Sequence, residues 1–331
     1  MSSRVRLVLF LGLVVMAGCV SEHQPTASIS PLRLPTRIPP TSTPTPTPVS
    51  AQPYYDAGRA CQKVGDAECA LESFTMAIET DPGFVAAYIA RGGVHLAQDR
   101  PKDALVDADA ALSIDSSSAS AHALRGEALR VMGRSYQALE AFDRAVALDP
   151  ALQEPLFRSQ WLAAIGADDN DRLIKLSREY GEAHPDDPVR HYYRGWAFIA
   201  WGDPGVAINI LIHGIEEVPD PPALLWFALG YAYLESDLWQ DAVTCFEIAL
   251  SLVRSGDTSL DLHSDNPVAD AFGALGLAYL GVDRCGDAER MLEHAIAIGA
   301  TAAEYAAALE EARLCLAATP LPTSTPFAPP P

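Results

Sequence analysis

The stretch that decides the fold is ALLWFALGYAYLESDLWQDAVTCFEIAL, residues 223–250. It contains two helical hydrophobic patterns separated by a short turn. Gly230 lies in the first pattern and Ala242 in the second, and small residues at such positions let two helices approach closely. Tyr233 and Phe246 supply rings that fill the space beside the contact. The stretch therefore predicts a tightly packed helix pair.

The same arrangement recurs along the chain at a regular spacing. A period of 34 residues aligns Gly58, Gly92 and Gly126, then Ala70, Ala104 and Ala138, then Ala77, Ala111 and Ala145. A fixed period of this length is typical of repeat architectures, in which each unit packs on its neighbours.

These positions resemble the tetratricopeptide-repeat family, whose pattern is an aromatic residue, Leu-Gly, Tyr, Ala, Phe, Ala and Pro. The residues that match it most closely are Trp226, Leu229, Gly230, Tyr233, Ala242, Phe246 and Ala249. The resemblance implies an all-α, right-handed superhelical solenoid of about seven helix-turn-helix units with a C-terminal capping helix. We expect the solenoid at 51–318, with units at 51–84, 85–118, 119–152, 154–187, 188–221, 223–256 and 269–302 and the capping helix at 302–317.

Two segments depart from the regular pattern. In the fourth unit Gln160 and Trp161 replace the Leu-Gly pair, which indicates a distorted repeat or a hinge. An insertion at about 255–267 is expected to form an exposed loop. A calcium loop is the alternative, but its ligands would follow a one-three-five spacing. The aspartates of the insertion recur instead at every fourth residue, as Asp257, Asp261 and Asp265.

The N-terminal residues have the character of an export signal. Two arginines precede the apolar run 7–15, and the small residues Ala17 and Gly18 precede Cys19. This segment resembles the signal peptide of bacterial lipoproteins, which implies removal of residues 1–18 and attachment of lipid, such as palmitate, to Cys19. A plain secretory signal is the alternative. The expected location is the bacterial cell envelope, outside the cytoplasm and lipid-anchored to a membrane.

Proline-rich segments flank the expected solenoid. The first, 19–50, contains PTRIPPTSTPTPTP at residues 35–48, and the second is the tail 319–331. Proline fixes φ and lacks an amide donor, so both segments are expected to be disordered, and the first is expected to act as an extended tether.

Charge and motif content exclude several functions. The chain has 23 Lys and Arg against 43 Asp and Glu, a net charge of -20, which argues against nucleic-acid binding. No Walker loop, dinucleotide fingerprint, nucleophile elbow or zinc-protease helix is present, and the eight histidines show no ligand spacing. We therefore expect no enzyme activity, no cofactor and no metal site.

Beyond the cysteine expected to carry lipid, five remain. Cys61 and Cys69 lie on the two sides of the first expected turn, and Cys285 and Cys315 belong to the last unit and the capping helix. An exported protein permits disulfides, so each pair could form a bridge that staples one end of the solenoid. The alternative is that all five are small buried apolar residues, as expected for Cys245.

The resemblance also implies where a partner would bind. In this family the first helix of each unit lines the concave face. Units five and six place there the apolar and aromatic residues Tyr192, Trp196, Phe227, Tyr231 and Leu234, whereas units one to three place Arg59, Lys63, Glu127 and Arg130. Exposed rings are typical of protein recognition. The alternative is that these rings pack against neighbouring helices or against a second copy of the chain.

Together these features predict an interaction scaffold or adaptor of the cell envelope, which binds a partner protein or peptide in the concave groove. The alternative is a homo-oligomeric structural component that uses the aromatic wall as a self-interface. An envelope enzyme with a non-standard site is a third hypothesis. It would require His, carboxylate and Ser side chains to converge in one pocket, which the repeat pattern does not suggest.

Overall fold

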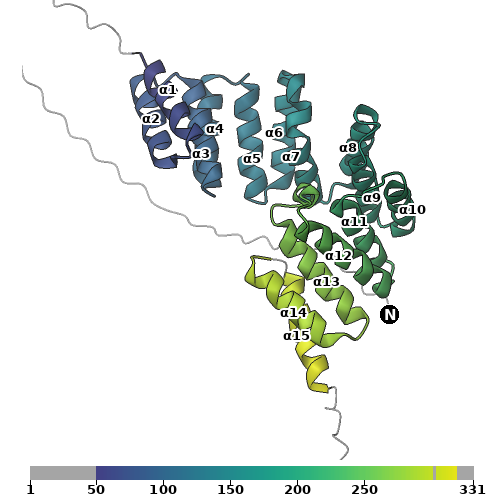
Figure 1. Cartoon of the computed structure of the whole chain (residues 1–331). Coiled ribbons are helices and arrows are strands. Elements are labelled where there is room, and N and C mark those ends of the chain that lie inside the picture. The colour runs from purple at the N-terminus through teal and green to yellow at the C-terminus, as the bar shows by residue number, and fades with distance from the viewer. Residues whose placement is uncertain (1–49, 301–302, 319–331) are drawn as a thin grey trace, which may run out of the picture. The chain divides into compact units, whose positions relative to one another are not determined.

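The computed structural model describes residues 50–300 and 303–318 (Figure 1). The expected signal segment 1–18, Cys19, nearly all of the expected tether and the tail 319–331 lie outside the described residues. Within the described ranges the chain forms fifteen α-helices and two short 3-10 helices, with no strand. None of these helices has both the length and the apolar character that crossing a bilayer requires.

The helices form seven consecutive pairs followed by one closing helix (Figure 1). The pairs are α1 (Gln52–Lys63) with α2 (Ala67–Thr80), α3 (Val85–Ala97) with α4 (Pro101–Ile114), α5 (Ala119–Val131) with α6 (Ser135–Leu148), α7 (Gln153–Gly166) with α8 (Asn170–Ala183), α9 (Val189–Trp201) with α10 (Pro204–Glu216), α11 (Ala223–Leu234) with α12 (Trp239–Arg254), and α13 (Pro267–Gly281) with α14 (Cys285–Ala297). The closing helix is α15 (Ala303–Ala318), and the 3-10 helices are η1 (Pro150–Leu152) and η2 (Ser259–Leu262). The first helices of most neighbouring pairs contact one another, so they form one layer.

Glycine at the eighth position of a pair permits the close helix contact. A Cβ built on Gly58, Gly126 or Gly230 would lie 2.5, 2.6 or 2.7 Å from a phenylalanine ring of the second helix. Real Cβ atoms do not approach carbon atoms so closely, so the ring occupies the space that a larger residue would take. The partner rings, Phe74, Phe142 and Phe246, are fully buried.

The turn inside each pair uses one residue in the left-handed region of φ. This conformation costs about 1–2 kcal/mol for residues with a Cβ, and Gly, Asn and Asp adopt it most readily. The seven pairs use only glycine or aspartate at this position: Gly65, Asp99, Gly133, Asp168, Gly202, Asp237 and Asp283. Every pair therefore carries, at its turn, a residue type that adopts a positive φ readily.

The fourth pair packs differently because Trp161 stands where other pairs carry glycine. Its side chain is fully buried. The ring centroid of Trp161 lies 4.8 Å from that of Tyr193 and 6.3 Å from that of Phe157. Tyr180 completes the cluster at 4.9 Å from Phe157. An aromatic cage thus replaces the close helix contact that glycine permits elsewhere.

Buried side chains are distributed unevenly along the chain. One continuous cluster runs from Leu129 on α5 to Ala312 on α15 and contains most of the buried rings. The N-terminal pairs have smaller clusters, one of them formed by Ala104, Ala108, Leu124 and Ala128. The C-terminal pairs therefore share a single aromatic core, while the first pairs are joined through small residues.

Disulfides join helices at both ends of the helical array. Cys61 of α1 is bonded to Cys69 of α2, with their Cα atoms 5.8 Å apart. Cys285 of α14 is bonded to Cys315 of α15, with a Cα separation of 6.0 Å. A terminal repeat has only one neighbour, so a crosslink there opposes fraying.

Candidate functional site

The insertion between α12 and α13 folds back onto the first helices of several pairs. We call residues 257–266 the inner strap; it contains η2. Leu260 is 1% exposed and His263 is 8% exposed. The sequence-based expectation of an exposed loop is therefore wrong, because the segment carries apolar and aromatic groups that are buried against the helices.

His263 of the inner strap inserts among the rings predicted to line an open groove. Its ring centroid lies 4.6 Å from Trp196, 4.5 Å from Phe227 and 6.2 Å from Tyr231. The Tyr192 hydroxyl lies 3.0 Å from His263 Nδ1, within hydrogen-bonding distance. The strap thus occupies the inner wall of pairs five and six.

This placement corrects the predicted binding groove. Tyr192 and Phe227 are fully buried, so they cannot contact a partner. Trp196, Tyr231 and Leu234 are partly buried and pack against the same core cluster. The structure does bring the four predicted rings together, but they pack against His263 of the strap and do not line an open groove. Sequence position places these residues on the inner face and cannot show that the chain itself covers them.

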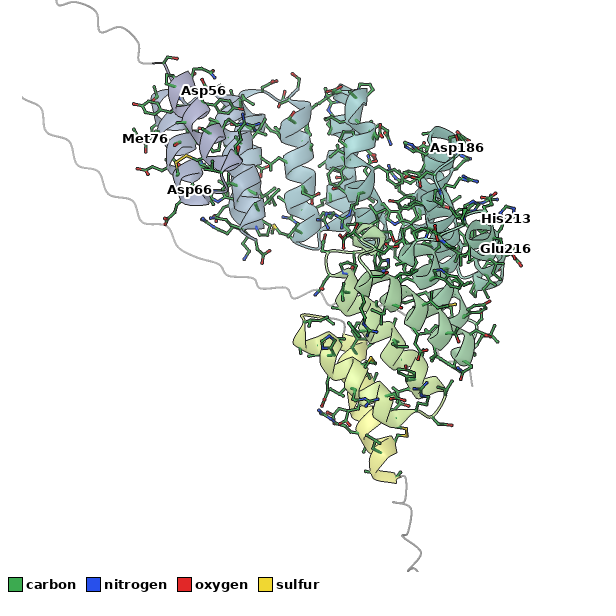
Figure 2. All side chains as sticks on the ribbon, viewed as in Figure 1. Asp56, Asp66, Met76, Asp186, His213 and Glu216 are labelled. Atoms are coloured by element: carbon green, nitrogen blue, oxygen red, sulfur yellow. A yellow bond between two sulfur atoms is a disulfide. The ribbon has the colours of Figure 1, made fainter. Side chains whose placement is uncertain are left out.

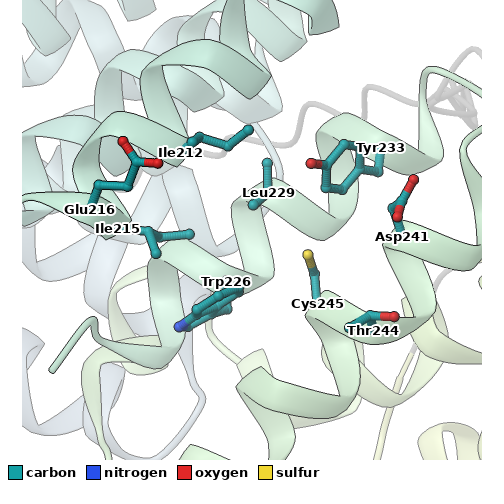
Figure 3. A pocket seen from close by; sticks show the side chains of 9 residues that line it. All are labelled: Ile212, Ile215, Glu216, Trp226, Leu229, Tyr233, Asp241, Thr244 and Cys245. Atoms are coloured by element: carbon teal, nitrogen blue, oxygen red, sulfur yellow. The ribbon is translucent and has the colours of Figure 1, made fainter.

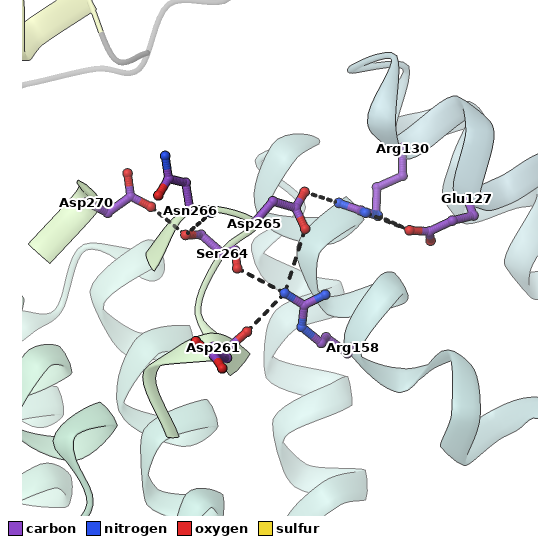
Figure 4. A network of polar contacts seen from close by, with 8 residues as sticks. All are labelled: Glu127, Arg130, Arg158, Asp261, Ser264, Asp265, Asn266 and Asp270. Carbon is purple, nitrogen blue, oxygen red and sulfur yellow. Dashed lines mark hydrogen bonds and ion pairs between the residues drawn. The ribbon is translucent and has the colours of Figure 1, made fainter. Parts of the chain in front are cut away.

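Arginines on α5 and α7 hold the second half of the strap (Figure 4). The Arg158 guanidinium donates to the carbonyl oxygens of Asp261 and Ser264 at 3.0 and 2.9 Å. The Asp265 carboxylate lies between Arg130, at 2.8 Å, and Arg158, at 3.7 Å. Arg130 also pairs with Glu127 at 2.6 Å. These contacts join the strap to pairs three and four.

The first half of the strap caps α11. The Asp257 carboxylate accepts the Ala223 amide proton at 2.9 Å, and the Ser259 hydroxyl accepts the Leu224 amide proton at 3.1 Å. Pro222, at the N-cap position of α11, supplies no side-chain hydrogen bond, so the strap satisfies amides that would otherwise lack partners. Asp257 and Asp265 are therefore engaged with amide and guanidinium donors, which argues against calcium.

The buried groups where the centre of the strap meets the helices carry no charge. Burial lowers the pKa of His263 to about 3, so the imidazole is neutral at neutral pH. Burial also raises the pKa values of Tyr192 and Tyr231 well above their ordinary value, so both phenols stay neutral. Because every group at the contact is neutral, the rings can pack without an uncompensated buried charge.

The inner face of the first pairs presents a different surface. Gly93 on α3 lies in open space, since a Cβ built there meets no atom within 4 Å. Ile89 and Leu96 lie on the same side of α3, where both pack in part against the cluster of Ala104, Ala108, Leu124 and Ala128 and stay partly exposed. On α1, Arg59 and Lys63 are exposed and stand one helical turn apart. We call Gly93, Ile89, Leu96, Arg59 and Lys63 the N-terminal inner face.

A small cavity lies between α10, α11 and α12, with a volume of about 270 Å³ (Figure 3). Trp226, Leu229 and Tyr233 of α11 line it together with Cys245 of α12. Burial, with a smaller effect from Asp241, raises the pKa of the Cys245 thiol to about 12. Since the thiolate is the nucleophilic form, Cys245 is an inert packing residue at neutral pH.

Two histidines and a glutamate converge where α9 meets the C-terminal end of α10. His191 Nε2 lies 2.6 Å from Glu217 Oε2, and His213 Nδ1 lies 3.4 Å from Glu217 Oε1. Arg190 donates to the same Oε2 atom at 2.8 Å. His213 and Glu216 lie at the right-hand edge of the view in Figure 2. The histidines show no ligand spacing along the sequence, yet the fold brings two of them to one carboxylate.

Comparison with solved structures identifies the fold. A tetratricopeptide repeat protein from Parabacteroides merdae is 16% identical, with a TM-score of 0.68 over 80% of this chain and 98% of that one. This chain has the tetratricopeptide-repeat fold. The predicted fold class is thereby confirmed. The Cut9-Hcn1 structure is 17% identical, with a TM-score of 0.51 over 79% of this chain and 54% of that one. No family model and no curated protein matches the sequence.

Two features of this tetratricopeptide-repeat structure could not be predicted from the sequence, because each joins residues that are far apart along the chain. The strap binds Arg130 from 135 positions away, and no local pattern encodes such a contact. The histidine cluster joins His191 to a glutamate 26 positions later. One signal was available, because His213 and Glu217 are four residues apart on a helical segment and therefore face the same side.

Proposed function

We propose that the chain is a non-enzymatic interaction scaffold that binds an extended segment of a partner protein on the N-terminal inner face. The observation that carries the proposal is the open space at Gly93 between the partly exposed side chains of Ile89 and Leu96. A partner backbone can approach closely where no Cβ projects. The strap covers the equivalent wall of pairs five and six, which leaves the first pairs as the accessible inner surface.

Charge favours an acidic partner segment. The chain carries a net charge of -20, yet Arg59 and Lys63 are two exposed cations one turn apart on α1, a helix that contacts α3. A local positive site attracts an acidic segment, while the acidic remainder of this chain repels other acidic surfaces, and the combination supplies register and selectivity. We therefore propose a partner segment that pairs apolar side chains with carboxylates.

The alternative of self-association through the aromatic wall loses its main support. Tyr192 and Phe227 are fully buried beneath the strap, so they offer no apolar area to a second copy. Trp196 and Tyr231 are directed against His263. The proposed interface therefore lies on the first pairs.

Filling the open space at Gly93 should abolish partner binding. In native membranes, Gly93→Trp is expected to lower the recovery of a crosslinked partner by about tenfold or more, since a bulky ring would displace the partner at the centre of the contact. Gly181→Trp on α8 is the matched control, because a Cβ built on Gly181 also meets no atom within 4 Å. Crosslinking and mass spectrometry of the full-length chain measure the result.

Equal recovery from the Gly93→Trp and Gly181→Trp variants would place the binding site elsewhere. Failure to recover any specific protein from native membranes would contradict the scaffold proposal as a whole. Charge reversal of Arg59 and Lys63 to Glu tests the acidic partner separately, with Lys102→Glu, at an exposed position on α4, as its control.

We propose further that a lipid on Cys19 anchors the protein to the membrane of a bacterial cell envelope. The support is the arrangement of two arginines, an apolar run and the small residues Ala17 and Gly18 before Cys19. Acyl chains contribute about 0.8 kcal/mol per buried methylene, so more than one chain anchors a protein stably without a spanning helix. The proline-rich segment after Cys19 would then set the distance of the binding face from the membrane.

Substitution of the proposed lipid-bearing cysteine should release the protein. Cys19→Ser is expected to move most of the chain from the membrane fraction to the soluble extracytoplasmic fraction, as followed by immunoblotting after fractionation. Cys245→Ser serves as the control, since Cys245 is a buried free thiol. An unchanged membrane fraction for Cys19→Ser, or the absence of a lipid mass on the mature N-terminus, would exclude this anchor.

A further inference from the structure

Three potential metal ligands lie together where α9 meets the C-terminal end of α10. One ring nitrogen of His191, one of His213 and one carboxylate oxygen of Glu217 all lie within 4.8 Å of one another. His191 comes from α9, while His213 lies on α10 and Glu217 at its C-cap. Gly214 permits the approach, since a Cβ built there would lie 2.6 Å from His191 Cβ. The helix contact thus brings the His191 ring against the exposed end of α10.

We propose that His191, His213 and Glu217 form a binding site for a divalent transition-metal ion of the zinc type. Two imidazoles and one carboxylate are a common catalytic zinc ligand set, which leaves a position for water. With ligand bonds of about 2.0–2.1 Å, a tetrahedral ion needs donor atoms about 3.3–3.5 Å apart. The 3.4 Å between His213 Nδ1 and Glu217 Oε1 fits this spacing.

The tautomer of His191 is compatible with metal binding. The ionised Glu217 carboxylate can only accept hydrogen bonds, so His191 Nε2, which lies 2.6 Å from Glu217 Oε2, carries its proton toward it without metal. An ion bound at His191 Nε2 would take the lone pair of that nitrogen, and the ring proton would move to Nδ1.

Arg190 defines how the carboxylate would bind. Its guanidinium donates to Glu217 Oε2, which also lies against His191 Nε2. Oε1 lies on the side of His213 and is the oxygen available to an ion. A hydrogen bond to the second oxygen is the usual arrangement around a ligating carboxylate. The positive charge of Arg190 opposes the ion, so we expect weaker binding than at a four-ligand structural site.

Ligand type predicts selectivity. Magnesium and calcium prefer oxygen ligands in larger numbers, whereas imidazole nitrogen suits zinc, copper and nickel. The side chains of His213 and Glu217 are 66% and 39% exposed, so an ion can reach them from solvent. We therefore expect zinc to bind in the presence of millimolar magnesium, which would mask the many unspecific carboxylates of an acidic protein.

Calorimetric titration with zinc chloride tests the site. Untagged full-length chain in detergent, stripped with chelator and held in excess magnesium at pH 7.5, is expected to bind one zinc ion per chain. His213→Ala and Glu217→Gln should each weaken binding by about tenfold or more. His184→Ala is the matched control, because His184 lies 4.0 Å from Glu154 as an isolated His–Glu pair.

Thermal unfolding supplies an independent readout. A ligand that joins α9 to α10 should raise the melting temperature of the wild type and of His184→Ala, and leave that of His213→Ala unchanged. His213 and Glu217 are partly exposed, so their variants should fold even if variants of the buried His191 do not. The absence of zinc binding, or zinc binding that survives in the His213→Ala and Glu217→Gln variants, would overturn the proposal.

Discussion

Replacing Trp161 by alanine should destabilise the protein by about 3–5 kcal/mol. The substitution moves the fourth pair closer to the repeat pattern, which carries a small residue at this position. Trp161 nevertheless packs against Phe157 and Tyr193 in the aromatic cage that Tyr180 completes, and it is fully buried. Its removal would leave a large cavity between helices that are held apart by the other rings.

Urea unfolding followed by circular dichroism measures this effect. Trp201→Ala is the matched control, because Trp201 is 54% exposed at the end of α9, and it should change stability by well under half as much. A loss below about 1 kcal/mol for Trp161→Ala would show that the pair closes around alanine as the other pairs close around glycine. That result would contradict the interpretation that the aromatic cage of the fourth pair replaces the close helix contact found in the other pairs.

Regular positions explain why the fold was predictable. Gly126 and Phe142 meet in the same way as Gly230 and Phe246, so one helix pair specifies the contact for the others. Each pair packs mainly on its neighbours, which turns a repeated sequence into a repeated structure. The departure at Trp161 was visible in the sequence, but its consequence depends on Tyr193, which belongs to the next pair.

The candidate site was less predictable because the chain covers part of it. The repeat pattern places Phe227 on the inner face correctly, yet His263 lies against it from an insertion outside any repeat. The register of such a segment follows from contacts such as Arg158 with Ser264, which join distant positions. Local patterns therefore locate the inner face, whereas only the folded chain shows which part of that face stays accessible.

Acid should weaken the protein through His263. The folded state holds this imidazole neutral, with its pKa lowered to about 3 from an ordinary value near 6.5 by burial. Between these two values the unfolded chain binds a proton that the folded chain does not. Stability is therefore fully present above about pH 6.5 and falls by about 1.4 kcal/mol per pH unit as the pH approaches 3.

His263→Asn isolates this contribution from that of other titrating groups. Asparagine can place a polar atom near the position of Nδ1, 3.0 Å from the Tyr192 hydroxyl, but it does not titrate. The variant should be less stable than the wild type at pH 7.5, because it loses the ring contacts with Trp196 and Phe227. As the pH falls toward 4 the difference should narrow or reverse.

Urea unfolding of both proteins between pH 7.5 and pH 4 measures the two stability curves. His184→Asn is the control, since the His184 ring packs against Tyr180 away from the strap, and its curve should run parallel to that of the wild type. Parallel curves for His263→Asn and the wild type would mean that His263 can take up a proton without leaving its ring contacts. Converging curves would instead show that the folded state excludes the proton from His263, so that the hold of the strap on the inner wall weakens as the pH falls.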